Sequence, residues 1–540
     1  MNFNQCRFFN IFRKNGPVKQ NVFLLVLLGI LTFHGLINYQ VLTRGNSCYI
    51  YDEYVRVSSG YSAFQDIFIT PGLSFQERTQ WFFQLDNGQG HPHLFELIEA
   101  FSWKILAAFG KTDPGLVILL ANLFFLFILL SSVYEIGSVL YDKRTGLLAA
   151  LLGSMLPMVF GLSRVAMLDY PLMCMCSLSC CLLLKTNRFV SVKYSVLFGV
   201  IFGLTELTKE SAVIFLGPLV IYYFINSLRK GGSKKAVVGF LAGMLSFLIV
   251  TGIVYLRADN PHVYGTYISK MHIVNSVSFF YYFHTFKDFV GPWVLIVSFP
   301  FFLSYWVKFK ERDWILFFWF FIPFILFSLS PNKTTRFMMP LAPVWALLIA
   351  RGVLVNDWPK LVRRISVFIF IIVLTAQYAA YNLEWLLPPE GYVLEKGRLS
   401  VEHDPYAATV TGLVHVFNEE ASAVDAPAMV IPLFNTGAIN DSLGLDFNLA
   451  RLPFWVMCPI ELDEVDAQHS SWKGFPQEIL MGHYILDKVE APDMHTNSEI
   501  NFIGRGLRAG FLKYRDHFEK IAEVPVYDNS RVDVYRRIKR

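Results

Sequence analysis

Two adjacent carboxylates, Asp52 and Glu53, follow the first long apolar run of the chain at residues 22–37. Arg56 lies three residues after Glu53. The packing of apolar helices gives no reason for such a group beside a membrane span, where charges cost more the deeper they lie. A carboxylate here can accept a proton from an attacking hydroxyl group. The segment 51–56 is therefore a candidate for general-base catalysis.

Further charged residues lie where later apolar runs meet, in the segments 163–171, 206–211 and 330–337. Each charge taken alone is typical of an interfacial anchor or of one half of a structural ion pair. Their gathering on one predicted face of the membrane domain favours a shared polar cavity that opens outward. The residues predicted to line this cavity are Asp52, Glu53, Arg56, His91, Asp169, Lys209, Lys333 and Arg336.

A mixture of carboxylates and cations suits a group transfer to a hydroxyl group. A carboxylate can remove the proton from the attacking hydroxyl. Fixed cations can stabilise a phosphate that leaves with additional negative charge. Since cations would already stabilise that phosphate, we predict no metal ion and no other cofactor. The cysteine spacing does not suggest a zinc site.

The elements that must position these residues are membrane helices. Of the 540 residues, 54% are apolar and 16% are charged, whereas soluble domains carry about 25% charged residues. Apolar runs of roughly 17–25 residues recur, and each can cross a hydrocarbon core. The composition becomes that of a globular domain after residue 400. We therefore predict an α-helical multi-pass membrane domain at 1–390 and a small α/β domain outside the cytoplasm at 391–540.

Eleven apolar runs are candidate spans, and the loops between them alternate in charge. The short loops rich in Lys and Arg all fall on one side, so placing them in the cytoplasm satisfies the positive-inside rule. The N-terminus is then cytoplasmic, and Asp52, Glu53 and the C-terminal domain lie outside. The predicted spans are about 21–40, 114–135, 146–162, 168–184, 194–208, 211–228, 236–256, 289–307, 314–330, 337–354 and 365–383.

Two outer loops are long. In the loop at 41–113, residues 61–85 mix aromatic and charged side chains at nearly helical spacing, which predicts helices in the membrane interface. Pro71 and Gly72 would divide these helices. In the loop at 257–288, the aromatic and basic residues, Lys270 among them, are either interfacial anchors or ligand contacts.

The first apolar run and the cysteines bear on targeting and redox state. The run does not end in a small-residue cleavage site, so we interpret it as an uncleaved span. Four of the seven cysteines lie within one apolar run, at 174–181, and are typical packing residues. Cys48 and Cys458 both lie outside the cytoplasm in this topology, and a disulfide between them is an open alternative.

The C-terminal domain combines strands and helices. The runs at 428–433, 483–486, 521–525 and 532–536 have strand character, and the last two flank a turn at 528–530, which predicts a hairpin. Helical stretches at 407–420 and 506–517 lie among the strands.

Four features together resemble a family of membrane enzymes. They are the acidic pair after the first span, His-Pro-His-Leu at 91–94, Arg164 with Asp169, and Leu-Thr-Lys at 207–209 followed by the Lys, Arg and Pro residues of 333–340. Their order, spacing and common face resemble the GT-C superfamily of membrane glycosyltransferases. Within it, they resemble the branch of the protein O-mannosyltransferases and of the aminoarabinose transferases that modify lipid A.

The resemblance implies a polyprenyl-phosphate-linked sugar as donor and a lipid, glycan or protein as acceptor on the outer side. It implies that Asp52 is the catalytic base, with Glu53 and Asp169 as further acidic groups. The residues implied to bind the donor phosphate or sugar are Arg56, His91, His93, Arg164, Lys209, Glu210, Lys270, Lys333 and Arg336. Two residues separate the acidic pair from Arg56, where the aminoarabinose branch has one, so the branch, sugar and acceptor stay open.

The implied reaction is a single displacement that inverts the anomeric centre, because base and leaving group flank the sugar on opposite faces. A transporter or flippase of a lipid-linked or anionic substrate is the main alternative, since it also needs intramembrane charges. No internal repeat is visible and the charges gather on one side, which favours an enzyme. A structural assembly factor is a third interpretation. We expect a bacterial inner membrane as location, and no nucleic acid as partner.

Overall fold

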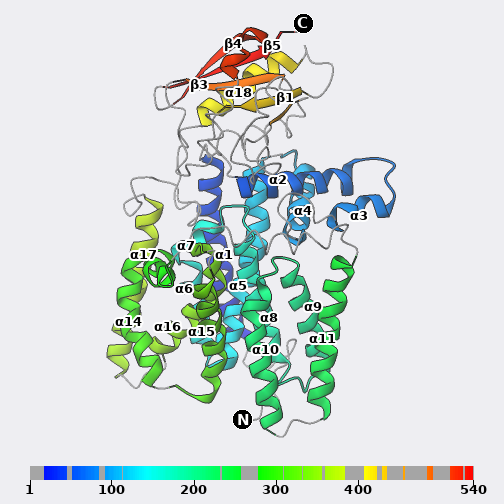
Figure 1. The fold of residues 1–540 in the computed structure, drawn as a ribbon. Helices are drawn as coiled ribbons and strands as arrows, with labels where there is room; N and C mark the ends of the chain where they lie inside the picture. Colours follow the sequence, from blue (N-terminus) through cyan, green and yellow to red (C-terminus); the bar gives the residue numbers. More distant parts are fainter. Residues whose placement is uncertain are drawn as a thin grey trace. The chain divides into compact units, whose positions relative to one another are not determined.

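The computed structural model describes residues 17–44, 51–83, 92–111, 113–230, 234–256, 278–307, 309–330, 333–354, 359–383, 407–421, 428–433, 454–456, 483–489, 511–526 and 530–538. The chain forms two compact units, one of residues 1–43 with 59–401 and one of residues 44–58 with 402–540. Figure 1 shows that helices make up the first and that a sheet lies in the second. The predicted domain boundary near 390 falls outside the described residues.

The first unit consists of helices whose ends follow from local sequence. At two helix starts an aspartate caps free backbone N–H groups: Asp113 accepts from Gly115 and Leu116, and Asp142 from Arg144 and Thr145. The residues of α2 (Tyr51–Phe64) are divided between the two units after residue 58. The other helices are α1 (Pro17–Arg44), α3 (Phe75–Phe83), α4 (Leu94–Ala108), α5 (Pro114–Leu140), α6 (Lys143–Ser154), α7 (Pro157–Leu162), α8 (Asp169–Lys185), α9 (Val192–Glu206), α10 (Ala212–Arg229), α11 (Lys234–Tyr255), α13 (Tyr281–Val290), α14 (Pro292–Val307), α15 (Trp314–Leu329), α16 (Ala342–Leu354) and α17 (Lys360–Asn382).

Seven helices of the described chain are long and apolar enough to cross a membrane, or eight if the bent pair α13 and α14 is one span. This confirms the predicted class of a multi-pass helical membrane protein. Helices α8 and α9 are shorter, at 17 and 15 residues. The predicted span at 146–162 is divided into α6 and α7. The total of eleven spans stays a prediction.

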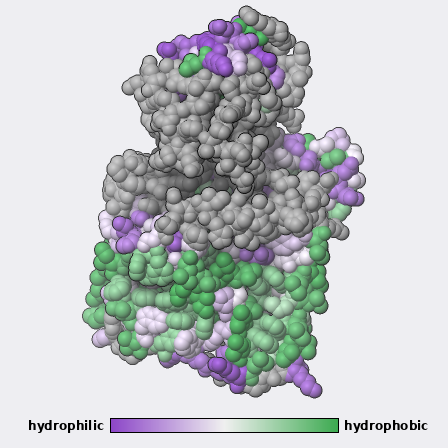
Figure 2. Space-filling view, in the orientation of Figure 1, coloured by the Kyte–Doolittle hydropathy of each residue, from purple (hydrophilic) through white to green (hydrophobic). Residues whose placement is uncertain are grey.

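Large apolar side chains cover the outside of the helical unit. On α11, Leu241, Leu245 and Leu248 are each about three-fifths exposed, as expected for side chains that face lipid rather than water. Figure 2 shows apolar residues, in green, gathered in a broad band over the helices. By contrast, α16 is buried almost throughout. Helix α16 therefore lies in the interior, and α11 at the periphery.

Small residues allow α9 and α11 to approach closely, and the two helices lie side by side in Figure 1. Gly199 of α9 packs against the backbone carbonyl of Gly243 in α11, where an added Cβ atom would overlap the oxygen. Ser195, Gly199 and Gly203 follow one another at a spacing of four residues. This pattern is typical of membrane helices whose backbones touch.

Helices α13 and α14 meet at a bend of 105°. Gly291 lies between them with φ of 88°, a conformation that glycine adopts without steric cost. Gln377 of α17 satisfies the backbone groups that the bend leaves open. Its Oε1 accepts from the N–H groups of Trp293 and Val294 at 3.0 and 3.1 Å, and its Nε2 donates to the carbonyl of Val290 at 3.1 Å.

Helices occur in both of the loops that were predicted to lie outside, although the sequence predicted interfacial helices in only one of them. Helix α2 continues as a π-helix, η1 (Gln65–Ile69), and the chain then breaks at Pro71 and Gly72 before α3, as predicted. The predicted loop at 257–288 ends in α13, so the following span begins only after the bend at Gly291. Lys270 and the rest of residues 257–277 lie outside the described residues.

A buried ion pair joins several helices at the end of the bundle that is predicted to be cytoplasmic. Nε of Arg351 in α16 lies 3.3 Å from Oδ1 of Asp313, and both side chains are almost fully buried. The hydroxyl of Tyr141 at the end of α5 also donates to Asp313. The other carboxylate oxygen accepts from the N–H of Lys310 at 2.7 Å. The carboxylate thus has several donors, as a buried charge requires.

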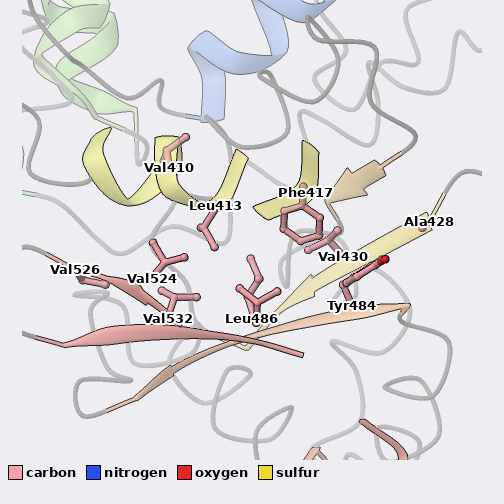
Figure 3. Packing of buried hydrophobic residues seen from close by; sticks show 11 residues of the cluster. Val410, Leu413, Phe417, Ala428, Val430, Tyr484, Leu486, Val524, Val526 and Val532 are labelled. Atoms are coloured by element: carbon pink, nitrogen blue, oxygen red, sulfur yellow. The ribbon is translucent and has the colours of Figure 1, made fainter. Parts of the chain in front are cut away.

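The second unit contains a five-stranded sheet in the order β2-β1-β3-β5-β4. Strands β1 (Ala428–Pro432), β2 (Phe454–Val456) and β3 (Tyr484–Val489) are parallel, whereas β4 (Phe518–Pro525) and β5 (Arg531–Arg537) form the predicted antiparallel hairpin. Strand β2 was not predicted. Helix α18 (Ala407–Glu420) covers one face, and Leu413 and Phe417 point from it toward the sheet in Figure 3. Val410 of the same helix belongs to this buried cluster.

Candidate functional site

Asp169 is the first residue of α8, and six residues connect it to the end of α7. Its side chain is 4% exposed. A carboxylate in the first turn of a helix is favoured by the positive end of the helix dipole. Pro171 in the same turn fits there, because a helix start does not need its missing N–H. The local sequence therefore fixes a buried carboxylate at this end of the helix.

Lys209 lies in the short connection between α9 and α10, and its Nζ is 2.7 Å from Oδ1 of Asp169. The lysine side chain is 13% exposed. Charged hydrogen bonds of this length are stronger than neutral ones. Two of the predicted site residues, 40 positions apart in the chain, are thereby brought into direct contact.

Arg336 approaches the same carboxylate from η4 (Thr335–Leu341), the turn before α16. Its Nε lies 3.8 Å from Oδ2 of Asp169, and its Nη1 donates to Sδ of Met167 at 3.1 Å. The ring of Phe337 lies near both cations, 4.8 Å from Lys209 Nζ and 6.0 Å from Arg336 Cζ. An aromatic face attracts cations. Asp169, Lys209 and Arg336 form one cluster, which we call the Asp169 cluster.

Further charged residues occupy the same connections. Lys333 lies three residues before Arg336 and is buried, as is Glu206 at the end of α9, while Glu210 next to Lys209 is half-buried. Such a density of charge in a mostly apolar unit is costly unless the groups pair or serve a function. The Asp169 cluster can therefore hold an anionic group against two cations, with a carboxylate that keeps both cations in place.

The acidic pair lies in the first turn of α2. Glu53 is fully buried and Arg56 is 4% exposed. Residues 44–58 belong to the second unit. The catalytic role expected for Asp52 stays a prediction, as does the binding role expected for Arg56.

The histidine segment is described only from residue 92 onward, so His91 lies outside the described residues. His93 is buried at the start of α4, with Nδ1 3.9 Å from Oε1 of Glu96. Glu96 and Glu99 are both fully buried on α4. A Cβ atom added to Gly60 of α2 would lie 2.6 Å from a carboxylate oxygen of Glu99. Neither glutamate was predicted from the sequence, although their spacing with Trp103 marks one buried helix face.

Arg164 is fully buried in the connection between α7 and α8. Its Nε donates to Oδ1 of Asn38 in α1 at 2.8 Å, and one terminal nitrogen donates to Oδ1 of Asn382 in α17 at 2.8 Å. The guanidinium also lies 5.1 Å from the centre of the Phe160 ring. These contacts direct Arg164 into the helical bundle. The amides that receive it were missed, although asparagine within apolar runs was a visible signal.

Metal binding was predicted to be absent. Among the described residues, no group of three or more His, Cys, Asp or Glu side chains could hold a metal ion. The four cysteines of α8 are buried. Cys48 and Cys458, the proposed disulfide partners, lie outside the described residues.

Comparison with known proteins supports the resemblance seen in the sequence. Residues 91–256 match the family described as dolichyl-phosphate-mannose-protein mannosyltransferase. This range contains Arg164, Asp169 and Lys209. No curated protein sequence matches the chain.

Solved structures show the same fold at low identity. The chain is similar to ArnT from Cupriavidus metallidurans in the apo state, with a TM-score of 0.59, 13% identity, and coverage of 95% of this chain and 97% of that one. ArnT bound to undecaprenyl phosphate gives a TM-score of 0.59 at 12% identity, covering 96% and 98%.

A third structure is the oligosaccharyltransferase AglB from Archaeoglobus fulgidus with an inhibitory peptide and a dolichol-phosphate. It gives a TM-score of 0.55 at 12% identity, covering 92% of this chain and 72% of that one. The chain thus has the GT-C fold of membrane glycosyltransferases, and its resemblance to the mannosyltransferase and aminoarabinose-transferase branch is confirmed.

Proposed function

We propose that the protein transfers a sugar from a polyprenyl-phosphate donor to an acceptor on the outer face of the membrane. The observation that carries this proposal is the Asp169 cluster, in which Lys209 and Arg336 both approach one buried carboxylate. Two cations held in place at the end of a bundle suit a phosphate group that gains charge as it leaves. The GT-C fold and the ArnT structure bound to undecaprenyl phosphate support the same class of donor.

In the proposed reaction, the acceptor hydroxyl attacks the anomeric carbon of the sugar. Asp52 takes the hydroxyl proton as the new bond between oxygen and carbon forms. The bond between the anomeric carbon and the phosphate oxygen breaks, and its electron pair leaves with the polyprenyl phosphate. Lys209 and Arg336 stabilise that charge. The anomeric centre is inverted, because the two bonds lie on opposite faces of the sugar.

Six further residues that were predicted to bind the donor are proposed to contact it. They are Arg56, His91, His93, Glu210, Lys270 and Lys333. The acceptor is a lipid, a glycan or a protein. The proposed orientation, with the N-terminus in the cytoplasm and the C-terminal domain outside an inner membrane, follows the positive-inside pattern.

The test uses the purified full-length chain in lipid nanodiscs and a panel of sugars linked to undecaprenyl phosphate. We expect release of undecaprenyl phosphate together with a glycosylated acceptor, and loss of at least 100-fold in kcat for Asp52→Asn. Asp66→Asn, which removes another carboxylate of the same outer segment, is the matched control and should retain activity. Near-normal transfer by Asp52→Asn would exclude Asp52 as the catalytic base. Transport of the labelled lipid without transfer of its sugar would contradict the proposed transferase activity.

A further inference from the structure

The segment 163–168, which directly precedes Asp169, is buried along its whole length. It joins α7 to α8 without belonging to either helix. Backbone hydrogen bonds tie it to the end of α7, from Arg164 to Gly161 at 3.3 Å and from Val165 to Leu162 at 3.3 Å. Side chains of other helices bind the backbone carbonyl groups that remain. Asn122 of α5 provides the first such contact. Its Nδ2 donates to the carbonyl oxygens of Ser163 and Val165, each at 3.0 Å.

Two more asparagines hold the same segment from other helices. Nδ2 of Asn38 in α1 donates to Oγ of Ser163 at 2.9 Å, while its Oδ1 accepts from Nε of Arg164. Asn382 of α17 accepts from the other side of the guanidinium and donates to the carbonyl of Tyr378 at 2.7 Å. Asparagines from three helices thus bind three consecutive residues, Ser163, Arg164 and Val165.

The other end of the segment meets the Asp169 cluster. Arg336 donates to Met167 and lies near Asp169, which Lys209 also contacts. The segment is therefore held at its start by neutral amides and at its end by cations. Hydrogen bonds to a charged group are stronger than neutral ones. The loss of an amide that binds Arg164 should therefore shift the segment, because an apolar bundle offers the guanidinium few other partners.

We propose that Asn38, Asn122 and Asn382 are positioning residues that fix the segment 163–168 and thereby hold the Asp169 carboxylate against Lys209 and Arg336. Arg164 is part of this arrangement, because its hydrogen bonds go to asparagines of the helical bundle rather than to the donor. The inference rests on the proposed function for its kinetic consequence, whereas the placement of Asp169 can be tested without any activity.

The test compares Asn38→Ala and Asn382→Ala with Gln377→Ala. Gln377 is the matched control, because it is a buried amide of α17 that bonds only backbone groups of the α13–α14 bend in the described structure. All three variants lose buried hydrogen bonds and stability. Only the two asparagine variants release the segment 163–168, which precedes Asp169.

The first measurement is the rate at which formaldehyde and cyanoborohydride methylate Lys209, followed by peptide mass spectrometry on the folded protein. In Asn38→Ala and Asn382→Ala, Lys209 loses its fixed carboxylate partner, so the rate should rise several-fold. In Gln377→Ala it should stay at the wild-type value. An unchanged Lys209 rate in both asparagine variants would overturn the proposal, whatever the activity of the protein.

The second measurement is transfer kinetics. We expect kcat per folded molecule to fall about 10- to 100-fold in the asparagine variants. This range is typical of residues that position a site without contacting the substrate. Asn382→Asp, which keeps the acceptor for Arg164, should recover most of that loss. Equal kcat in the wild type and the asparagine variants would contradict the positioning role of these asparagines. Absence of transfer by the wild type would instead overturn the proposed function and leave the labelling test standing.

Discussion

The Nζ atom of Lys209 lies 2.7 Å from Oδ1 of Asp169, although Asp169 begins α8 and Lys209 follows the end of α9. The pair is mostly buried, so neither charge is stabilised by bulk water. Breaking such a pair by removing one partner is costly, because the other charge stays buried. Removal of Lys209 should therefore affect both the stability of the fold and any reaction at the Asp169 cluster.

Lys209→Ala is the first prediction. Transfer should fall by at least 100-fold, because the departing phosphate loses a cation and Asp169 loses its nearest partner. Lys209→Arg should keep part of the activity, since it retains the charge but not the geometry. Steady-state kinetics with a polyprenyl-phosphate sugar would measure both. Lys234→Ala, an exposed lysine at the start of α11, is the control, and a loss of similar size there would contradict the site.

The ion pair of Arg351 and Asp313 leads to a stability prediction. Arg351→Met should lower the free energy of unfolding by about 3–5 kcal/mol, because the Asp313 carboxylate remains buried without its cation. The double variant Arg351→Met/Asp313→Asn should recover part of the loss, since no charge is then left behind. Thermal unfolding of the solubilised protein gives the comparison. A single variant as stable as the wild type would show that the pair adds nothing.

The contact of α9 with α11 predicts a steric effect at Gly199. Gly199→Ala places a methyl group on the carbonyl of Gly243, so the helices must separate at a cost of about 1–3 kcal/mol. Gly252→Ala on α11 is the control, because its nearest neighbour is a flexible leucine end at 3.8 Å. The melting temperature should fall for Gly199→Ala and stay unchanged for Gly252→Ala. The reverse order would refute the close packing.

The core of the C-terminal unit gives the fourth prediction. Leu413 of α18 is fully buried against the sheet, whereas Leu512 is 62% exposed. Leu413→Ala should destabilise this unit by about 2–5 kcal/mol through lost burial and a cavity. Leu512→Ala should change its stability by less than about 0.5 kcal/mol. Hydrogen exchange of β3 and β5 in the full chain reports on the unit, and equal protection in both variants would contradict this core.

Much of the fold followed from patterns that are local in the sequence. Apolar runs predicted the membrane helices, because the thickness of the bilayer fixes their length and composition. The turn at 528–530 predicted the β4–β5 hairpin, since a short connection between strands leaves few other pairings. The bend at Gly291 was not predicted, because residues 281–288 mix aromatic with charged side chains and were assigned to an outer loop rather than to a helix.

The site was predicted as a set of residues but not as a set of contacts. Charges at span ends identified Asp169, Lys209 and Arg336, because the cost of charge near lipid marks them in any apolar sequence. The cost of charge near lipid also identified Arg164, and the family resemblance implied that this residue binds the donor. Its hydrogen bonds to Asn38 and Asn382 cross 126 and 218 residues of chain, and no local pattern contains such distances.

The sequence by itself determined the membrane class, the order of the charged segments and the strands of the C-terminal hairpin, since each depends on hydropathy or spacing within a few residues. Only the tertiary structure decided that Lys209 and Arg336 share Asp169, that Arg164 turns into the bundle, and that three asparagines hold the segment between them. Those choices depend on which helices become neighbours, and helix packing is settled by side chains far apart in the chain.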